Sequence, residues 1–402
     1  MKLKKVKRSL YIVGFLSAYI NGICLYIPSL NFLSALSSGF VLMSICAWGL
    51  KSVIDLLDAP VWRFALFCTV LVLSMVSYLN SGQTYLLLGS LAIMALDGIS
   101  VRRMLKLWLV CTLAVFATML LASLAIVCFG DASELYTYRR DGTFRLSLLF
   151  SHPNILAAYS SMAIIVYLLT REGISAANEL LAIVLATVMF LATDSKTSLI
   201  VVFAFLFLFH LFQRKEKSTY LIIRLLPLVL LAFVVVITEQ GEDFKLYGLF
   251  QSLLTGRPGY WSLQFKSIGF TAFGQQALTG TVFLNNWYYE HVTIDSFFAS
   301  ALLQLGVWSA IAFIVLYERD ISLLKNTVTT SSDKAALLAA LAALALFGLV
   351  ETHMASIGIC PLLLLLGNPM PDKNVLVDEE ARFDLCAQVS VRNTERSGEL
   401  NA

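Results

Sequence analysis

Long apolar runs separated by short polar breaks extend from the N-terminus to about position 367. Each run is about 15–25 residues long, which is the length that an α-helix needs to cross the hydrocarbon core of a bilayer. The runs show no sustained alternation of apolar and polar residues, so a membrane β-barrel is not expected. They predict helices at 9–27, 30–50, 61–79, 84–98, 105–129, 153–170, 177–193, 197–213, 219–238, 294–317, 334–350 and 353–367.

The pattern therefore predicts an all-α polytopic membrane protein, with about twelve transmembrane helices in residues 1–367. The closely spaced runs around Pro28 and around Glu351 have a second interpretation, in which one of them is a re-entrant segment. Composition agrees with a membrane location, since 58% of the 402 residues are hydrophobic, 14% are charged and the mean hydropathy is +0.80. A soluble domain has too few polar residues at these proportions to cover its surface.

The distribution of Lys and Arg predicts the orientation. With the basic N-terminus in the cytoplasm, only seven of the 29 Lys and Arg fall on the outer side, in agreement with the positive-inside rule. No convincing cleavage motif follows the first apolar run, which we interpret as an uncleaved helix. The same count of spans places the C-terminus in the cytoplasm, and the polar tail at 368–402 is predicted to be disordered.

Two of the predicted outer loops are long, at 130–152 and at 239–293. Long loops in compact proteins are usually functional or disordered, and the second loop is too rich in aromatic residues to be disordered. Leu246, Leu249 and Leu253 recur at helical spacing, as do Trp261 and Phe265 after Pro258. We expect short amphipathic helices that lie near the membrane surface in the 239–293 loop.

The outer loops also hold the charged residues that the orientation rule does not explain. Arginine binds phosphate oxygens through two N–H groups at once, and a nearby histidine or carboxylate can accept a proton from an attacking hydroxyl. Such a set suits glycosyl transfer from a lipid diphosphate. The candidate substrate-binding residues are Arg139, Arg140, Arg145, Asn154, Lys196, Arg257, Tyr260, Trp261, Glu351 and His353, and the candidate catalytic residues are His152, His291 and Asp295.

Each candidate also has a structural interpretation. The arginines can bind anionic headgroups, His152 can cap the helix that begins at Pro153, and Lys196 can pair with Asp194. Tyrosine and tryptophan at the ends of membrane helices form an interfacial belt in many unrelated proteins. The seven cysteines show no metal-ligand spacing and the outer loops contain no Asp-rich motif, so no metal is expected. No other cofactor and no nucleic-acid partner is expected either.

The order of these motifs resembles the O-antigen ligase and polymerase superfamily, and within it the Wzy-type polymerases of polysaccharide repeat units. The resemblance covers about residues 130–320. It rests on the arginine loop before Ser151-His152-Pro153-Asn154, on Asp194-Ser195-Lys196-Thr197-Ser198, on Thr255-Gly256-Arg257 with Trp261, and on Asp295-Ser296-Phe297 followed by Leu305-Gly306.

This resemblance implies a bacterial inner or plasma membrane enzyme that moves a glycan from an undecaprenyl diphosphate carrier onto another sugar. It implies that Arg139, Arg140 or Arg145, together with Arg257, hold the diphosphate, and that His291 is the nearest match to the catalytic histidine of the ligases. Val292 follows His291 where the ligases have asparagine, which leaves Asp295 and His152 open as the base. Implied partners are the lipid-linked oligosaccharide, membrane lipids, a flippase and a chain-length regulator.

Other classes of function remain as alternatives. A ligase would transfer finished glycan to a different acceptor, and the sequence does not separate it from a polymerase. A flippase or other transporter would have charged residues along a route through its helices, whereas the predicted spans are nearly free of charge. A membrane protein with a purely structural role is the remaining alternative.

Overall fold

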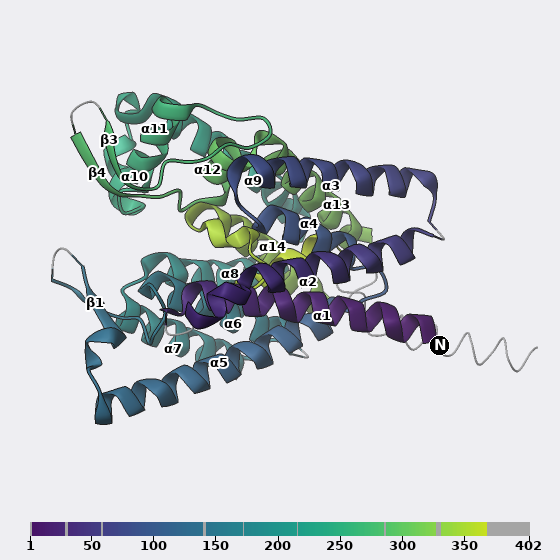
Figure 1. Ribbon diagram of the computed structural model, residues 1–402, viewed down its shortest axis with the longest axis horizontal. Helices are drawn as coiled ribbons and strands as arrows, with labels where there is room; N and C mark the ends of the chain where they lie inside the picture. Colours follow the sequence, from purple (N-terminus) through teal and green to yellow (C-terminus); the bar gives the residue numbers. More distant parts are fainter. Residues whose placement is uncertain are drawn as a thin grey trace, which may run out of the picture.

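The computed structural model describes residues 2–28, 31–57, 59–139, 142–171, 173–214, 216–284, 287–326 and 331–367. At a few positions within these ranges, including 282–284 and 287–291, the description covers the backbone alone. The described chain is a bundle of α-helices with two small β-hairpins at one end. Figure 1 shows both hairpins at the left of the bundle and the N-terminus at the right. We call these two ends the hairpin end and the N-terminal end.

Nine of the described helices are long and apolar enough to cross a membrane, so the chain is a polytopic membrane protein. They are α1 (Lys2–Tyr26), α2 (Asn31–Leu56), α3 (Val61–Ser81), α5 (Val101–Phe129), α6 (Pro153–Thr170), α7 (Ala176–Thr193), α8 (Lys196–Arg214), α9 (Glu216–Gln240) and α14 (Ser331–Val350). The shorter α4 spans Tyr85–Met94, and α13 spans Val307–Asn326. Most predicted helices lie within a few residues of these bounds.

Two buried helices that contain many small residues form the centre of the bundle. Helix α14 is rich in alanine and is buried along most of its length, and it packs against α8, α9 and α6. Helix α6 is buried almost throughout and carries alanine and serine on several of its faces. Small side chains let helix backbones approach closely, which is the usual basis of packing in membranes where lipid removes the hydrophobic driving force between helices. In contrast, α3, α5 and α7 expose many leucine and valine side chains.

Two of the predicted spans are not continuous helices. The expected span at 294–317 begins as α12 (Phe297–Ser300), continues as a π-helical turn at Ala301–Leu305 and breaks at Gly306 before α13. The expected span at 353–367 consists of two 3₁₀ segments, η5 (Thr352–Ala355) and η6 (Pro361–Leu366). Residues 357–366 are buried, and the Gly358 carbonyl accepts a hydrogen bond from the Trp108 indole at 2.7 Å. Irregular backbone is tolerated at membrane depth when protein surrounds it.

The two long loops fold at the hairpin end. The first contains strands β1 (Tyr136–Tyr138) and β2 (Phe144–Leu146), which pair antiparallel. The second contains α10 (Tyr247–Leu253), α11 (Arg257–Ile268), and the antiparallel strands β3 (Gly280–Leu284) and β4 (Trp287–Val292). The short helices match the expectation for 239–293, whereas neither hairpin was predicted. Residues 368–402, for which a disordered tail was predicted, lie outside the described residues.

Candidate functional site

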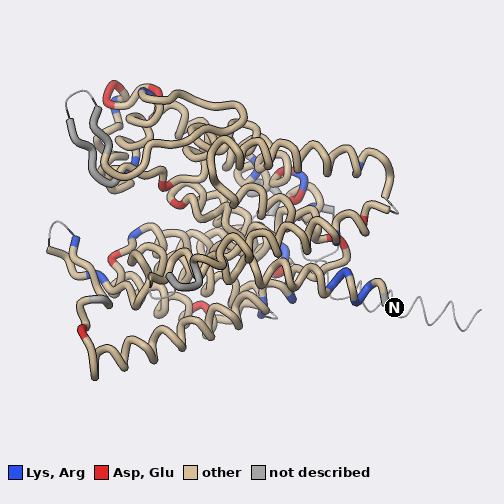
Figure 2. Tube along the Cα trace, viewed as in Figure 1, with Lys and Arg blue, Asp and Glu red and all other residues tan. Residues whose placement is uncertain are grey.

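Charged residues are concentrated toward the two ends of the described chain, and most of the helix length between them carries none (Figure 2). At the hairpin end they form two groups, each built around a buried arginine. The Arg145 group consists of Arg139, Arg145, Asn154 and Asp194, and the Arg257 group consists of Arg257, Asp295, Glu351 and His353. A charged side chain that faces lipid costs free energy. Charged residues in a membrane protein therefore usually face the interior of the bundle and pair with one another.

The Arg145 group joins strand β2 to the start of α6 and the end of α7. Arg145 donates from Nε to the Thr193 carbonyl at 2.7 Å and from Nη2 to the side-chain oxygen of Asn154. Asp194 ends α7 in the left-handed conformation with a φ of 49°, which turns the chain into α8 and brings its carboxylate 2.7 Å from Arg139. Arg145 is buried, whereas Arg139 remains partly exposed.

The Arg257 group is the more deeply buried of the two. Gly256, with a φ of 86°, caps α11, and Arg257 is the first residue of that helix. Its guanidinium donates to the Val350 carbonyl from Nη1 and to Glu351 Oε1 at 3.2 Å from Nη2. The Nε atom lies 3.7 Å from Asp295 Oδ2, which is longer than a hydrogen bond. Arg257 and Glu351 are buried, while the Asp295 side chain is 41% exposed.

His353 completes this group through the second oxygen of the same carboxylate. Its Nδ1 lies 3.2 Å from Glu351 Oε2, so Glu351 joins a buried arginine to a histidine. Burial alone would raise the pKa of Glu351, but the hydrogen bonds and positive charges of His353 and Arg257 outweigh it and lower that pKa. A carboxylate that fixes one imidazole nitrogen leaves the other oriented for proton transfer, as in many acid–base sites.

His152 lies between the two groups. It caps α6, and its Nδ1 accepts a hydrogen bond from the Asn154 backbone N–H at 3.1 Å. Partial burial lowers the pKa of His152, and the positive charge of Arg145 lowers it further. The negative charges of Asp295 and Glu351 raise this pKa but do not offset the decrease. The ring is therefore neutral at neutral pH, and its Nε2–H can donate a hydrogen bond rather than accept a proton.

Tyr26, at the end of α1, connects the loop before α6 to His353. Its carbonyl accepts a hydrogen bond from the Ser151 backbone N–H at 2.8 Å, and its ring meets the His353 ring edge-on with centroids 5.1 Å apart. No sequence signal marks this residue, because a tyrosine at a helix end is common in membrane proteins. Asp194 was expected to pair with Lys196, the nearer cation in sequence, but its partner is Arg139.

The remaining candidates differ in position. Lys196 is the exposed first residue of α8, and no ion pair with Asp194 is described. Trp261 is fully buried in α11, and its Nε1–H has no hydrogen-bond partner among the described residues, while Tyr260 is partly exposed. His291 belongs to β4, but its side chain lies outside the description, and Arg140 lies outside the described residues altogether. The roles predicted for these two residues stay predictions.

Two further features affect what this end of the protein can bind. Helices α6 and α8 both begin here, so the positive ends of their dipoles add to the arginine charges. Among the described side chains, no three His, Cys, Asp or Glu residues come together as metal ligands. The arginines and the helix N-termini together suit the binding of an anion.

Comparison with known proteins identifies no relative: no protein-family model matches the chain, and neither a curated protein nor a solved structure is significantly similar to it.

Proposed function

We propose that this protein is a membrane glycosyltransferase that joins lipid diphosphate-linked oligosaccharide repeat units, as Wzy-type polymerases do. The observation that carries the proposal is the buried chain from Arg257 through Glu351 to His353, with the Arg145 group at the same end of the bundle. The resemblance in motif order across about 130–320 supports the same function. The proposal implies a bacterial cell membrane and an undecaprenyl diphosphate-linked substrate.

The buried arginines are suited to stabilise a diphosphate leaving group. Glu351 and the Val350 carbonyl hold the Arg257 guanidinium in place, so that little reorganisation is needed as negative charge develops in the transition state. The loose contact with the half-exposed Asp295 marks the side of Arg257 on which a phosphate oxygen would compete. Arg139 and the Nε2–H of His152 would contact the same lipid headgroup from the other side.

His353 is the residue that we assign as general base. In the reaction, an acceptor sugar hydroxyl attacks the anomeric carbon of the donor, and the bond from that carbon to the diphosphate oxygen breaks. The hydroxyl proton passes to His353 Nε2, and the undecaprenyl diphosphate departs as an anion held by the arginines. The sequence pointed to His291, Asp295 and His152 for this role. Asp295 lies 3.7 Å from Arg257, and His152 uses its Nδ1 to accept the Asn154 backbone N–H.

The test is incubation of purified protein with a lipid diphosphate-linked repeat unit, followed by sizing of the products. We expect a ladder of chain lengths from the wild type. His353→Gln should lower the rate by about 10²–10⁴-fold, the usual contribution of a general base. His210→Gln is the matched control, because His210 also pairs with a carboxylate, that of Glu179 at 3.0 Å. His210 lies near the C-terminus of α8, at the opposite end of that helix from the two arginine groups.

Three results would count against the proposal in different ways. Absence of any product from the wild type rejects glycosyl transfer from this donor class. Equal rates in His353→Gln and His210→Gln reject His353 as the base. A single addition to a different acceptor, without a ladder, would indicate a ligase.

A further inference from the structure

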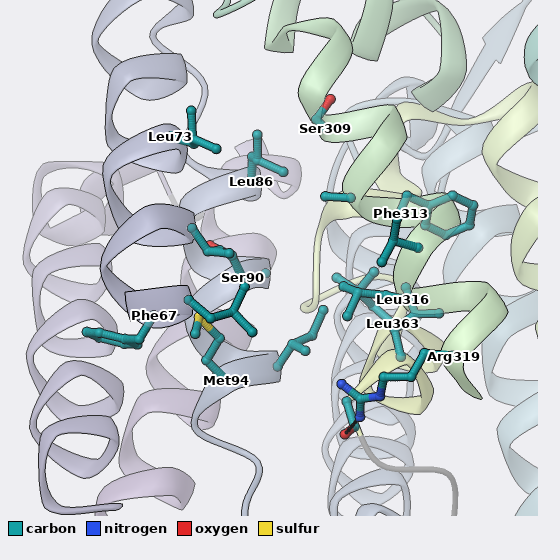
Figure 3. A pocket seen from close by; sticks show the side chains of 18 of the residues that line it. Phe67, Leu73, Leu86, Ser90, Met94, Ser309, Phe313, Leu316, Arg319 and Leu363 are labelled. Atoms are coloured by element: carbon teal, nitrogen blue, oxygen red, sulfur yellow. Dashed lines mark hydrogen bonds between the residues drawn. The ribbon is translucent and has the colours of Figure 1, made fainter. Parts of the chain in front are cut away.

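A long groove lies between α3 and α4 on one wall and α13 and η6 on the other. Its lining reaches Phe297 and Ala355, which are two residues from Asp295 and His353 of the Arg257 group. Its volume is about 900 Å³. Figure 3 shows Leu86, Ser90 and Met94 on one wall facing Phe313, Leu316 and Leu363 on the other. The groove is therefore lined mainly by aliphatic and aromatic side chains.

The groove is open to the surroundings of the bundle. Its lips carry large apolar side chains that are about half exposed or more, namely Leu66 on α3 and Ile311 and Val315 on α13. In a membrane protein such exposed faces contact lipid chains. Eleven residues separate Trp62 from Leu73 on the α3 wall, which corresponds to a length of about 16 Å at the helical rise. That length accommodates most of an extended acyl chain.

One end of the groove is charged and aromatic. Arg63 on α3 and Arg319 on α13 line it from opposite walls, and each side chain is about half exposed. Their carboxylate partners, Asp97 and Asp320, lie at 3.4 and 3.5 Å, so both ion pairs are at the long end of the range. Trp62 is exposed beside Arg63, as expected at the level of lipid headgroups.

This charged end belongs to the N-terminal end of the bundle. Asp55, which also lines the groove, pairs with Lys7 of α1 at 3.0 Å and with the buried Lys51. The hydrogen bonds described for Arg63 use Nη1 alone, and those for Arg319 use Nη2 on the Gly367 carbonyl. Guanidinium donors therefore remain for a further acceptor between the two walls.

We propose that this groove binds an anionic glycerophospholipid, with one acyl chain along the apolar walls and the phosphate between Arg63 and Arg319. Arginine matches phosphate oxygens with paired N–H donors, and its charge favours an anionic lipid over a zwitterionic one. The occupant is distinct from the diphosphate substrate, whose headgroup would lie at the opposite end. The inference does not depend on the proposed glycosyl transfer.

The experiment is a lipid titration of the delipidated protein, followed by native mass spectrometry, with phosphatidylglycerol and phosphatidylcholine as probes. We expect phosphatidylglycerol to bind more tightly than phosphatidylcholine. R63Q/R319Q should lower the affinity for phosphatidylglycerol by roughly 30-fold, because each of the two basic side chains contributes about 1 kcal/mol to binding an anionic lipid. Arg224→Gln is the control, since Arg224 is equally exposed and pairs with Glu318 outside the groove.

A second variant tests the location without removing charge. Ala312→Trp places a large side chain in the groove and should weaken both lipids, whereas Ala125→Trp on an exposed face of α5 should weaken neither. Equal binding of the two lipids by the wild type would overturn the proposal, as would full retention of phosphatidylglycerol by R63Q/R319Q or by Ala312→Trp. Displacement of phosphatidylglycerol by undecaprenyl phosphate, unaffected by R63Q/R319Q, would assign the groove to the donor's own chain instead.

Discussion

Glu351 holds the hairpin end together at the scale of single residues. It binds Arg257 with one carboxylate oxygen and His353 with the other, and it is buried between α14 and η5. Removing one partner of a buried ion pair typically costs about 3–5 kcal/mol because the other charge is left without compensation. Arg257 and Glu351 are therefore structural requirements as well as candidate substrate contacts, and their variants need a folding control.

The lowered pKa of Glu351 predicts acid sensitivity. A carboxylate with a folded-state pKa below its unfolded value contributes stability that is present above the unfolded value, here 4.5, and lost as the pH falls through the folded value. The wild type should lose thermal stability in detergent as the pH falls below 4.5, and Glu351→Gln should lose less over the same range. The measurement is thermal unfolding at a series of pH values. Parallel pH profiles for the two proteins would show that Glu351 is not linked to folding in this way.

Sequence patterns found most residues of the site but not their partners. Arg257, Glu351 and His353 stood out because charge on the outer side needs an explanation in a membrane protein. The contact between Arg257 and Glu351 joins residues that are 94 positions apart, and no local spacing encodes such a contact. His353 was predicted as a substrate contact, and its candidacy as base rests on the contact by which Glu351 orients its ring.

At the scale of elements, Gly306 fixes how α13 begins beneath the 239–293 loop. It has a φ of 103°, and a Cβ at this position would lie 2.5 Å from the Ala272 carbonyl oxygen. The neighbouring Val307 backbone N–H donates to the Thr271 carbonyl at 2.9 Å, so the loop is fastened to the break between the π-helical turn and α13. Glycine is required here by both the conformation and the close approach.

Gly306→Ala should therefore destabilise the protein, by about 1–3 kcal/mol for the backbone strain and more for the clash. Gly49→Ala is the control, since Gly49 lies in helix α2 with no atom within 4 Å of an added Cβ. There alanine should be neutral or stabilising by up to about 1 kcal/mol. Thermal unfolding of both variants in detergent measures the difference. A Gly306→Ala protein as stable as Gly49→Ala would contradict the described geometry.

Helix prediction from apolar runs was correct where the run forms a regular helix. It was wrong where the run is apolar because it is buried inside the bundle. The 353–367 run is apolar because the bundle surrounds it, and apolar content does not distinguish a helix from buried 3₁₀ turns. Pro361 and the glycines at 358 and 367 were the local signals against a continuous helix. The hairpin at 280–292 was not predicted, because the two residues between its strands, Asn285 and Asn286, lack the glycine that marks most two-residue hairpin turns.

At the scale of the whole molecule, the composition establishes the membrane class but not the arrangement of helices. Helices α6 and α14 can lie at the centre because their small residues let neighbouring helices approach closely. Many helices in this chain contain alanine and serine, so composition alone does not identify the central ones. Charge asymmetry predicts which end faces the cytoplasm, and the fold places both arginine groups at the opposite end from Lys7 and Arg63.

The orientation can be measured with single cysteines and a membrane-impermeant maleimide in intact cells. Thr279→Cys, an exposed position before β3, should react from outside, whereas Lys5→Cys at the start of α1 should react only after the membrane is opened. The parent protein with its native cysteines gives the background labelling. Reaction of Lys5→Cys in intact cells, with protection of Thr279→Cys, would reverse the orientation and place the arginine groups in the cytoplasm.

The central claim is that the two arginine groups at the hairpin end bind a lipid diphosphate, and equilibrium binding to the purified wild type tests it without any substitution. Undecaprenyl diphosphate should bind about 10²–10⁴-fold more tightly than undecaprenol, because each of two charge-assisted contacts contributes about 1.5–3 kcal/mol. Added salt should reduce the preference. Equal affinities for the two lipids would contradict the claim.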